Sequence, residues 1–559
     1  MRRITSLLLS CILGIGMFGR NTVFVQAKET ADSVVASMTI EQKLAQMIMP
    51  SLRTWNDQDL TAINGELSSA LAKYDFGGVI LFSQNTKDAA QTTELINGIQ
   101  KAHLSGGFKS KLFVAIDQEG GRVTRLQTGT KMPGNMALAA TGNATNAFKA
   151  ANVIGRELAV QGFNLDFAPV VDVNNNPENP VIGVRSFSDD PAVVARFGAQ
   201  FVKGLHSQKV MACLKHFPGH GDTNVDSHTG LPVINKTYEE LEKNELVPYV
   251  SLVSNADFIM TAHIQYPQIE KDTYVSKANG QKINLPATLS KKILTGILRE
   301  NLGYKGLIIT DSMEMKAISD NFDKVDASAM AINAGADMIL MPVQLSSDRA
   351  LKELDAYMDG LLTKVKSGEI SEDRINESLK RIIETKIKYG LLNTSVEASS
   401  KKASDVVGSR QNKAVEWEIA KAGVTAVKND GVCPIEKDKK VVVFYPQADQ
   451  LGSIQNGIDM AGASAASLIC YGKGLDASAD SAIQNADVVV CLSTCATGEE
   501  LHKNTEVKTL VEKTKLADKK IVVLSTNLPY DLRELENADA LVACYGPGIN
   551  VTAAIYKLF

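Results

Sequence analysis

Short apolar segments alternate with amphipathic helical segments between residues 35 and 390. Seven of the short segments are apolar at successive positions and rich in β-branched residues. Strands that are apolar on both faces are typical of a parallel sheet buried between helices. Seven such strands, with an eighth expected to be irregular, favour a (β/α)8 barrel over a doubly wound sheet. The seven segments are 77–82, 112–117, 165–172, 210–217, 257–264, 306–311 and 337–342.

A second, smaller domain is predicted after the segment 396–409. That segment is rich in small and polar residues and has no apolar period, so we interpret it as a linker between two domains. A helix is expected over 411–428, and the apolar segments that follow it predict a second α/β layer structure. The sequence thus predicts an α/β protein in which a TIM-type barrel at 30–395 precedes an α/β sandwich domain at 410–559. The strand segments of the second domain are 440–446, 467–472, 487–493, 520–526 and 540–546.

Residues 1–27 have the composition of a secretory signal peptide. Arg2 and Arg3 precede an apolar run, and residues 25–27 (Val-Gln-Ala) offer a small-residue cleavage site. The run has about fifteen residues, fewer than the roughly 20 that cross a bilayer, so no integral membrane segment is expected in the mature chain. We therefore expect an exported protein, located outside the cell or at the cell wall. A lipid anchor on Cys11 is the less favoured alternative, because apolar residues continue after that cysteine.

The composition excludes some classes of partner. The 559-residue chain has a formal net charge of -4 and no long block of Lys or Arg, so we expect no nucleic-acid partner. Of the seven cysteines, those beyond Cys11 are too few for a disulfide scaffold. We expect buried thiols, and a bridge between Cys491 and Cys495 is left open, as is the oligomeric state.

Polar residues end five of the predicted barrel strands. In a (β/α)8 barrel the carboxyl ends of the strands meet at one mouth, where active sites lie. A single polar residue at a strand end is often only a loop residue, but five strands that end in this way indicate a functional site. These residues are Asp117, Asp172, Lys215 with His216, His263 and Asp311.

The segment KHFPGHGDTNVDSHTGLP, residues 215–232, holds three of the seven histidines. A zinc site is one interpretation, because several side chains of the segment are acceptable zinc ligands. Pro218, Gly219 and Gly221 exclude the helical spacing of histidines found in His-Glu-x-x-His sites, however. We therefore favour a site without a metal or cofactor. The possible ligands would have been His216, His220, Asp222, Asp226 and His228.

Acid/base chemistry is the interpretation that we favour for this segment. Asp226 lies two residues before His228, so its carboxylate can bond one ring nitrogen, raise the pKa of the imidazole and leave the other nitrogen free to move a proton. The Gly-x-Ser-x-Gly pattern of serine hydrolases is absent. Asp311, at the end of the strand segment 306–311, is the best candidate for a nucleophile. A carboxylate nucleophile that faces a proton donor is the arrangement of a retaining glycosidase.

Five segments together resemble glycoside hydrolase family 3, and within it the bacterial β-N-acetylglucosaminidases. The resemblance implies a glycoside hydrolase that removes terminal GlcNAc through a covalent glycosyl-enzyme. It also implies a carbohydrate substrate derived from peptidoglycan, in which GlcNAc is β-1,4-linked to an N-acetylmuramic unit. The segments are 115–126 (AIDQEGGRVTRL), 179–191 (NPVIGVRSFSDDP), 215–232, 260–264 (MTAHI) and 307–315 (LIITDSMEM).

The resemblance implies roles for individual residues. Asp311 matches the nucleophile, His228 the general acid/base and Asp226 the partner of that histidine. An Asp-x-His pair on a barrel loop separates the acetylglucosaminidase branch from the many β-glucosidases that draw this residue from the second domain. The residues implied in binding sugar hydroxyls or lining the pocket are Asp117, Arg125, Arg185, Lys215, His216 and His263.

Alternatives remain open at this point. A β-N-acetylglucosaminide phosphorylase could use the same residues, with phosphate in place of water. A sugar-binding protein would need neither Asp311 nor the pair of Asp226 and His228, and it is less favoured, as is a β-glucosidase. Family members with this second domain usually continue beyond the last helix of this chain. The resemblance therefore implies either a trimmed sequence or a shortened second domain.

Overall fold

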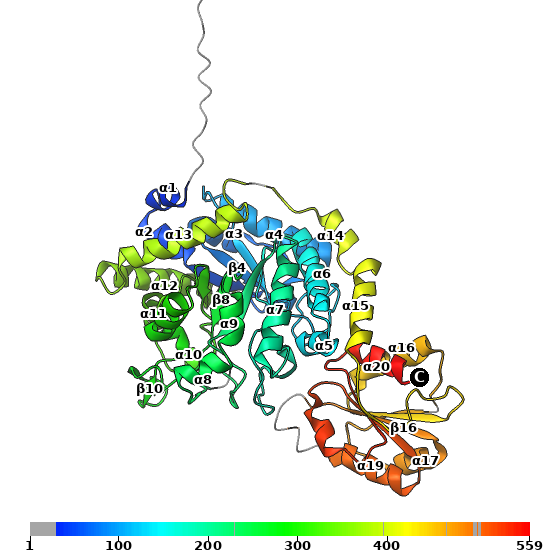
Figure 1. The fold of residues 1–559 in the computed structure, drawn as a ribbon. Helices are drawn as coiled ribbons and strands as arrows, with labels where there is room; N and C mark the ends of the chain where they lie inside the picture. The colour runs from blue at the N-terminus through cyan, green and yellow to red at the C-terminus, as the bar shows by residue number, and fades with distance from the viewer. Residues whose placement is uncertain (1–29, 229, 395, 466, 496–499, 501–504) are drawn as a thin grey trace, which may run out of the picture.

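The computed structural model describes residues 30–559 except 229, 395, 466, 496–499 and 501–504. A barrel domain and a smaller domain lie side by side and are joined through two helices (Figure 1). The predicted signal peptide lies outside the described residues. Within the described part of the chain, no helix combines the length and the apolar composition that a membrane crossing needs.

Eight parallel strands form the barrel, as the sequence predicts. Their order is β11-β8-β7-β6-β5-β4-β1-β12, and a parallel bridge between Ile309 and Met338 joins the two ends of this series. Every barrel strand residue is buried except Gln344 at the end of β12. The strands are β1 (Ile48–Leu52), β4 (Gly78–Leu81), β5 (Phe113–Ile116), β6 (Leu165–Asp166), β7 (Met211–Phe217), β8 (Phe258–Thr261), β11 (Leu307–Ile309) and β12 (Ile339–Gln344).

Two barrel strands differ from the sequence-based expectation. The unassigned eighth strand is β1, whose Pro50 has no amide hydrogen for a ladder and whose register shifts between Met49 and Ser51. The segment predicted as a strand over 165–172 keeps ladder pairing only in β6. Its remaining residues still follow the barrel wall, because the Val171 amide donates to the Lys215 carbonyl at 2.8 Å.

Helices surround the barrel and are fixed at their starts by capping side chains. The Asp88 and Ser347 side chains accept hydrogen bonds from the first turns of α4 and α12, and Asp190 does so for α7, which begins with Pro191. The connections that follow the strands contain α3 (Gly65–Lys73), α4 (Ala89–Leu104), α5 (Asn135–Ala140), α6 (Thr145–Gln161), α7 (Pro191–His206), α8 (Tyr238–Lys243), α9 (Val247–Leu252), the π-helix η4 (Lys292–Asn301), α10 (Lys316–Ser319), α11 (Lys324–Ala334), α12 (Asp348–Lys366) and α13 (Glu372–Lys388). The N-terminal helices α1 (Ala31–Ala36) and α2 (Ile40–Gln46) pack against α13.

The connection between the domains is partly helical. The predicted linker at 396–409 contains α14 (Ser400–Val406), which is capped by the Ser399 side chain, and α15 (Arg410–Gly423) follows it. The helix expected over 411–428 is therefore too long. It ends at Gly423, and the β-branched residues beyond it begin strand β13 (Thr425–Asn429).

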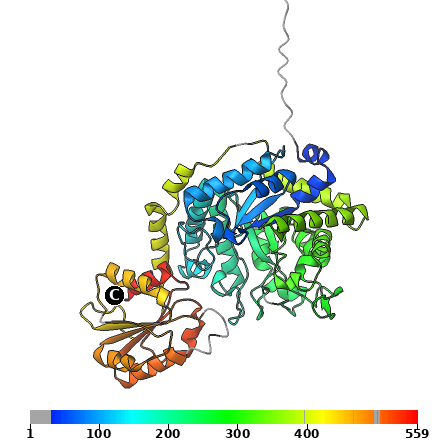
Figure 2. The same ribbon diagram turned by 180° about the vertical axis from the view of Figure 1, so that it is seen from behind.

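The second domain is a six-stranded mixed sheet between two layers of helices (Figures 1 and 2). Its order is β13-β18-β17-β16-β14-β15, and only β13 is antiparallel to its neighbour. Alternate residues of β14 pack against α16 and α20 on one face and against α17 and α19 on the other. These elements are β14 (Val441–Tyr445), α16 (Leu451–Ala461), β15 (Ser467–Cys470), α17 (Ala477–Asn485), β16 (Val488–Ser493), α19 (Thr505–Leu516), β17 (Lys520–Ser525), η6 (Pro529–Glu534), β18 (Ala540–Ala543) and α20 (Ile549–Leu558). Cys491 and Cys495 are not joined by a disulfide bond.

One buried carboxylate ties the barrel to the chain that leads to the second domain. Glu157 of α6 is 1% exposed and accepts hydrogen bonds from the Thr130 amide at 2.8 Å and the Thr130 hydroxyl at 2.6 Å. It also accepts from the Gly408 amide at 2.9 Å and the Asn412 side-chain amide at 2.7 Å. A barrel loop, the linker and α15 are therefore held by the same side chain.

Candidate active site

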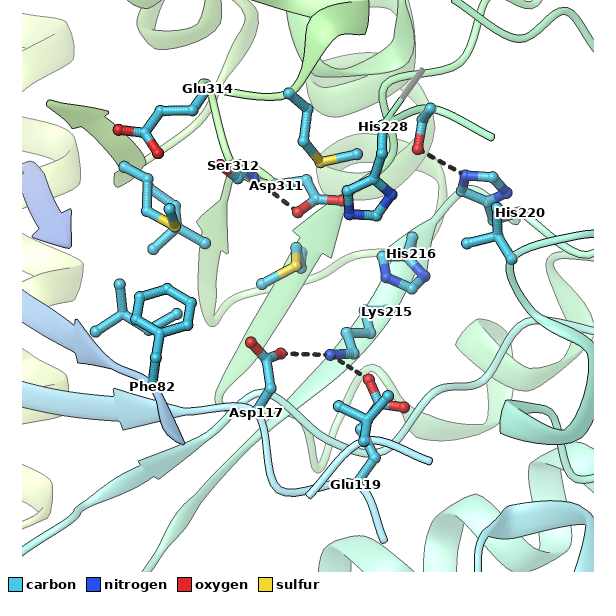
Figure 3. A pocket seen from close by; sticks show the side chains of 18 of the residues that line it. Phe82, Asp117, Glu119, Lys215, His216, His220, His228, Asp311, Ser312 and Glu314 are labelled. Atoms are coloured by element: carbon cyan, nitrogen blue, oxygen red, sulfur yellow. Dashed lines mark hydrogen bonds and ion pairs between the residues drawn. The ribbon is translucent and has the colours of Figure 1, made fainter. Parts of the chain in front are cut away.

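A pocket of 540 Å³ lies at the carboxyl ends of the barrel strands. Asp117 follows β5 and Asp311 follows β11, while Lys215 and His216 lie near the end of β7, and all four line the pocket. Figure 3 shows Asp311, His216 and His228 around this pocket, together with Lys215 bonded to Asp117 and Glu119. The predicted residues that line it are Asp117, Arg125, Arg185, Lys215, His216, His228 and Asp311.

A buried cluster of charges forms one wall. The Lys215 ammonium contacts Asp117 Oδ1 and Glu119 Oε1, both at 2.7 Å. The Arg185 guanidinium donates from Nε and Nη2 to the two oxygens of Glu119 at 2.9 and 2.8 Å. Arg185 Nη1 also donates to the Val181 carbonyl at 3.3 Å, so protein partners hold all three nitrogens of the guanidinium.

The cations in this wall determine the charge state of Glu119. Burial by itself would raise the pKa of Glu119, but Arg185 and Lys215 outweigh burial and hold that pKa well below its usual range. Burial would likewise lower the pKa of Lys215, but Asp117 and Glu119 raise it. The cluster therefore stays charged and offers strong, charge-assisted hydrogen bonds to a neutral ligand.

Asp172 orients His216 from behind the pocket. Asp172 is fully buried, and its Oδ2 lies 2.7 Å from His216 Nδ1, while its Oδ1 accepts from the backbone amides of His216 and His220. Burial would raise the pKa of Asp172, but His216 outweighs burial, so the pKa is lowered. Because Nδ1 is bonded to the carboxylate, Nε2 is the His216 atom that remains to contact a ligand.

The pair predicted from the histidine segment is formed. His228 Nδ1 lies 2.8 Å from Asp226 Oδ1, and the same oxygen accepts from the His228 backbone amide at 2.8 Å. The hydrogen bond to Asp226 raises the pKa of His228 despite partial burial, and it lowers the pKa of Asp226. The side chain of His228 is 63% exposed. His228 is thus a protonatable imidazole at the pocket, and its Nε2 is not engaged by Asp226.

Asp311 faces the pocket from the end of β11. Burial would raise the pKa of its carboxyl, but His216, His263 and the Ser312 amide outweigh burial and lower it. The Ser312 amide donates to Asp311 Oδ1 at 2.7 Å. His228 also lowers the pKa of Asp311, so the two residues interact electrostatically across the pocket. Asp311 is therefore an ionised carboxylate at a site open to ligand.

His263 does not occupy the position expected from the sequence. It is 1% exposed and is absent from the pocket lining, and its two ring nitrogens contact the Thr288 hydroxyl at 2.8 Å and the Ser312 carbonyl at 2.9 Å. Both nitrogens are therefore already bonded to protein. The expectation that His263 binds sugar is replaced by a supporting position behind the backbone of Ser312.

The remaining polar residues of the histidine segment shape its loop. His220 contacts the Thr223 hydroxyl at 2.9 Å and the Ser227 hydroxyl at 3.0 Å, and burial lowers the pKa of His220 to about 4. Asp222 forms an ion pair with Lys236 at 2.9 Å. The histidines thus have separate partners, and the described residues contain no group of three or more side chains placed to hold a metal ion.

Sequence reasoning missed several residues that line the pocket. Glu119 lies two residues after Asp117, and its charge inside a strand-end loop was the available signal. Arg53 stacks over the Phe82 ring with 3.9 Å between its Cζ atom and the ring centroid. Arg53 follows β1, so it was overlooked together with that strand. Glu314 also lines the pocket, and burial raises its pKa.

Comparisons with known proteins agree with this geometry. The family model described as glycosyl hydrolase family 3 N terminal domain matches residues 39–385. Beta-hexosaminidase A of Pseudoalteromonas piscicida is 36% identical over 480 residues, which cover 82% of this chain and 79% of that protein. A solved structure of a glycoside hydrolase family 3 beta-N-acetylglucosaminidase from Paenibacillus sp. str. FPU-7 has a TM-score of 0.79 and 32% identity, and the match covers 93% of this chain and 96% of that one.

A second relative supports the same assignment. The beta-N-acetylglucosaminidase/beta-glucosidase of Cellulomonas fimi is 30% identical over 427 residues, which cover 76% of this chain and 70% of that protein. A solved beta-glucoside phosphorylase, BglX, shares the fold with a TM-score of 0.79 but only 21% identity. The buried charged wall, the Asp226 and His228 pair, the ionised Asp311 and these matches lead to one conclusion: the chain belongs to glycoside hydrolase family 3 and is a glycoside hydrolase.

Proposed function

We propose that this enzyme is an exo-acting, retaining β-N-acetylglucosaminidase with a covalent glycosyl-aspartate intermediate. One observation carries the proposal: a single pocket contains an ionised carboxylate, Asp311, and an exposed imidazole, His228, whose Nδ1 is bonded to Asp226. These groups are what a retaining mechanism needs, namely a nucleophile and a proton donor that later acts as a base.

The first step transfers the sugar to the enzyme. A carboxylate oxygen of Asp311 attacks the anomeric carbon while the bond to the leaving oxygen breaks. Protonated His228 gives its Nε2 proton to that oxygen and becomes neutral, with Nδ1–H still donated to Asp226. The raised pKa of His228 favours the protonated form that this step requires.

The second step releases the sugar. Neutral His228 accepts a proton at Nε2 from a water molecule, and the water oxygen attacks the anomeric carbon. The bond to Asp311 breaks, so the carboxylate and the protonated imidazole are restored. Two displacements at one carbon retain its configuration.

The buried charged wall of the pocket suits a terminal pyranose. Asp117 and Lys215 present charged groups to neutral sugar hydroxyls, and His216 adds Nε2. Arg125 also lines the pocket, and its buried Nε has no hydrogen-bond partner among the described residues. A sugar hydroxyl or carbonyl oxygen could accept this hydrogen bond, so these residues are proposed to hold the terminal GlcNAc.

The substrate class is proposed from the relatives and from the expected export of the chain. The names of both relatives and of the Paenibacillus structure refer to hexosaminidase or N-acetylglucosaminidase activity. A secretory signal at 1–27 would place the enzyme outside the cell or at the cell wall. Disaccharide fragments of peptidoglycan, with GlcNAc at the non-reducing end, are the proposed substrate.

Product analysis tests this function. The purified enzyme is incubated with GlcNAc linked β-1,4 to N-acetylmuramic acid, with phenyl β-GlcNAc and with phenyl β-glucoside, each with and without inorganic phosphate. We expect free GlcNAc from the first two substrates at a rate that does not depend on phosphate. GlcNAc 1-phosphate as the main product would instead establish a phosphorylase, and faster cleavage of the glucoside would establish a β-glucosidase.

A further inference from the structure

The second domain contacts the barrel next to the active site, behind Arg185. Leu528, in the loop after β17, is fully buried and packs with Met136 and Val184 of the barrel and with Cys495. This cluster lies one residue from Arg185, whose side chain forms part of the pocket wall. The two domains thus share a small apolar core directly behind the sugar-binding side.

The turn that carries Arg185 packs between α5 of the barrel and the loop that carries Leu528. Residues 183–185 form a single 3-10 turn, η2 (Gly183–Arg185), and Gly183 has a φ of +46°, a left-handed conformation that glycine tolerates best. A Cβ atom on Gly183 would lie 2.9 Å from Leu528 Cδ2. The backbone of the turn therefore rests directly on a side chain of the second domain.

A hydrogen-bonded bridge reinforces this contact. The Asn174 side-chain amide donates to the Tyr530 hydroxyl of η6 at 3.2 Å, and Asn174 Oδ1 accepts from the Gly183 amide at 3.1 Å. Asn174 is 1% exposed, so the central side chain of the bridge is buried. Tyr530 thus reaches the first residue of the turn through one buried side chain.

The other end of this segment is anchored inside the barrel. The Asn179 side chain accepts hydrogen bonds from the amides of residues 181 and 182, and it donates to the carbonyls of His220 and Gly221 in the histidine segment. The segment 179–185 is consequently held on one side by the barrel and on the other by the second domain. At the end that bears Arg185, the Asn135 side chain of α5 donates to the Arg185 carbonyl at 2.7 Å. From the second domain, Leu528 packs against Gly183 and Val184, and Tyr530 reaches Gly183 through Asn174.

The loop that carries Leu528 is itself rigidly held. The Leu528 amide donates to the Cys495 carbonyl at 3.1 Å, and the Ser525 hydroxyl donates to the Leu528 carbonyl at 3.0 Å. The loop therefore presents Leu528 and Tyr530 as a fixed surface, continuous with the sheet of the second domain.

We infer that Leu528 and Tyr530 of the second domain are positioning residues, which hold Arg185 on Glu119 and thereby maintain the sugar-binding wall. Without them, the turn would be free to move away from Glu119, and Glu119 would hold Lys215, and through it Asp117, less firmly. The expected effect falls on sugar binding, since Asp226, His228 and Asp311 have no part in these contacts. This inference rests on the proposed function, in which that wall binds the terminal sugar.

The experiment measures the inhibition constant of GlcNAc and the steady-state parameters for phenyl β-GlcNAc in the full-length enzyme. Tyr530→Phe removes one neutral hydrogen bond, so we expect the inhibition constant to rise about fivefold, with kcat within about twofold of wild type. Leu528→Ala should raise the inhibition constant about tenfold or more. Leu528→Met keeps a large apolar side chain at this position and should retain most of the binding. The pH dependence of kcat should not change in any of these variants.

Matched controls lie in the same domain away from the interface. Tyr471 donates from a buried hydroxyl to the Leu492 carbonyl at 2.6 Å, and Leu510 of α19 is fully buried in the second domain core. Tyr471→Phe and Leu510→Ala should lower the thermal unfolding temperature but leave the inhibition constant unchanged. An equal rise in the control and interface variants would overturn the inference, because general destabilisation would then explain both.

Arg185→Ala separates failure of this inference from failure of the proposed function. We expect it to raise the inhibition constant at least as much as Leu528→Ala. If Arg185→Ala weakens GlcNAc binding but the Leu528 and Tyr530 variants do not, the positioning role is refuted and the proposed function stands. If Arg185→Ala has no effect on GlcNAc binding, the proposed sugar-binding wall is wrong and the inference falls with it.

Discussion

Replacing Asp226 by Asn should move the alkaline limb of activity to lower pH. Asp226 and His228 are 2.8 Å apart, and their side chains are 34% and 63% exposed. Solvent screening therefore limits their interaction to about 1 kcal/mol, which corresponds to about 0.7 pKa unit. Wild-type His228 has a pKa raised above 6.5, so the acid form is lost as pH rises through that raised value. In Asp226→Asn the acid form should be lost about 0.7 pH unit earlier.

The assay is kcat/KM between pH 5 and pH 9 with two aryl glycosides of GlcNAc. Phenyl β-GlcNAc has a poor leaving group that needs a proton, so its profile should show the shift. We also expect its maximal kcat/KM to fall about 100-fold, because the imidazole loses the carboxylate that orients it. The dinitrophenyl glycoside leaves without a proton, so it serves as the control and should lose much less. An unchanged alkaline limb for the phenyl substrate would refute the proposed action of Asp226 on His228.

Three further predictions concern the charged groups of the fold and the site. Glu119→Gln leaves Arg185 and Lys215 without their shared buried carboxylate. We therefore expect the free energy of unfolding, measured in urea, to fall by about 3 kcal/mol and the KM to rise. Unchanged stability would contradict the importance of this cluster. Glu157→Gln weakens the hydrogen bonds to Thr130, Gly408 and Asn412, so it should lower the free energy of unfolding by about 2 kcal/mol and leave kcat unchanged. A loss of kcat at full stability would contradict a purely structural role for Glu157. Dialysis against a chelator should leave kcat unchanged, whereas loss of activity that zinc restores would revive the metal interpretation of the histidine segment.

Much of the fold could be predicted because the barrel strands are buried on both faces. Six of the seven predicted barrel strands contain an observed strand, and β12 begins inside the seventh, 337–342, and ends two residues beyond it. Polar residues at the strand ends meet at one mouth as parallel topology requires. Strand β1 was missed because Pro50 interrupts its ladder. Pairing with the neighbouring strands β4 and β12 holds this segment in the barrel, and that pairing is not visible in the local sequence. The helix predicted to 428 failed for a related reason, since β13 gains its pairing from β18, more than 100 residues away.

The site was predictable where partners are close in sequence and less so where they are distant. Asp226 and His228 are two residues apart, so their hydrogen bond followed from spacing alone. Glu119 in the loop after β5 contacts Arg185 in η2 and Lys215 in strand β7, and no sequence spacing reveals these contacts. His263 follows a barrel strand like the residues that line the pocket, but Thr288 and Ser312 bond both of its ring nitrogens. Position in a strand therefore indicated proximity to the site, and the contacts decided the role.

The covalent intermediate is the central claim, and it can be trapped directly. His228→Ala lacks the base for the second step but should still be glycosylated by the dinitrophenyl glycoside of GlcNAc, so the glycosyl-enzyme should accumulate. After acid quenching and proteolysis, mass spectrometry should find one GlcNAc on the peptide that contains Asp311, and none in Asp311→Asn. Absence of any adduct, an adduct on another residue, or release of an oxazoline formed by the acetamido group would contradict nucleophilic attack by Asp311.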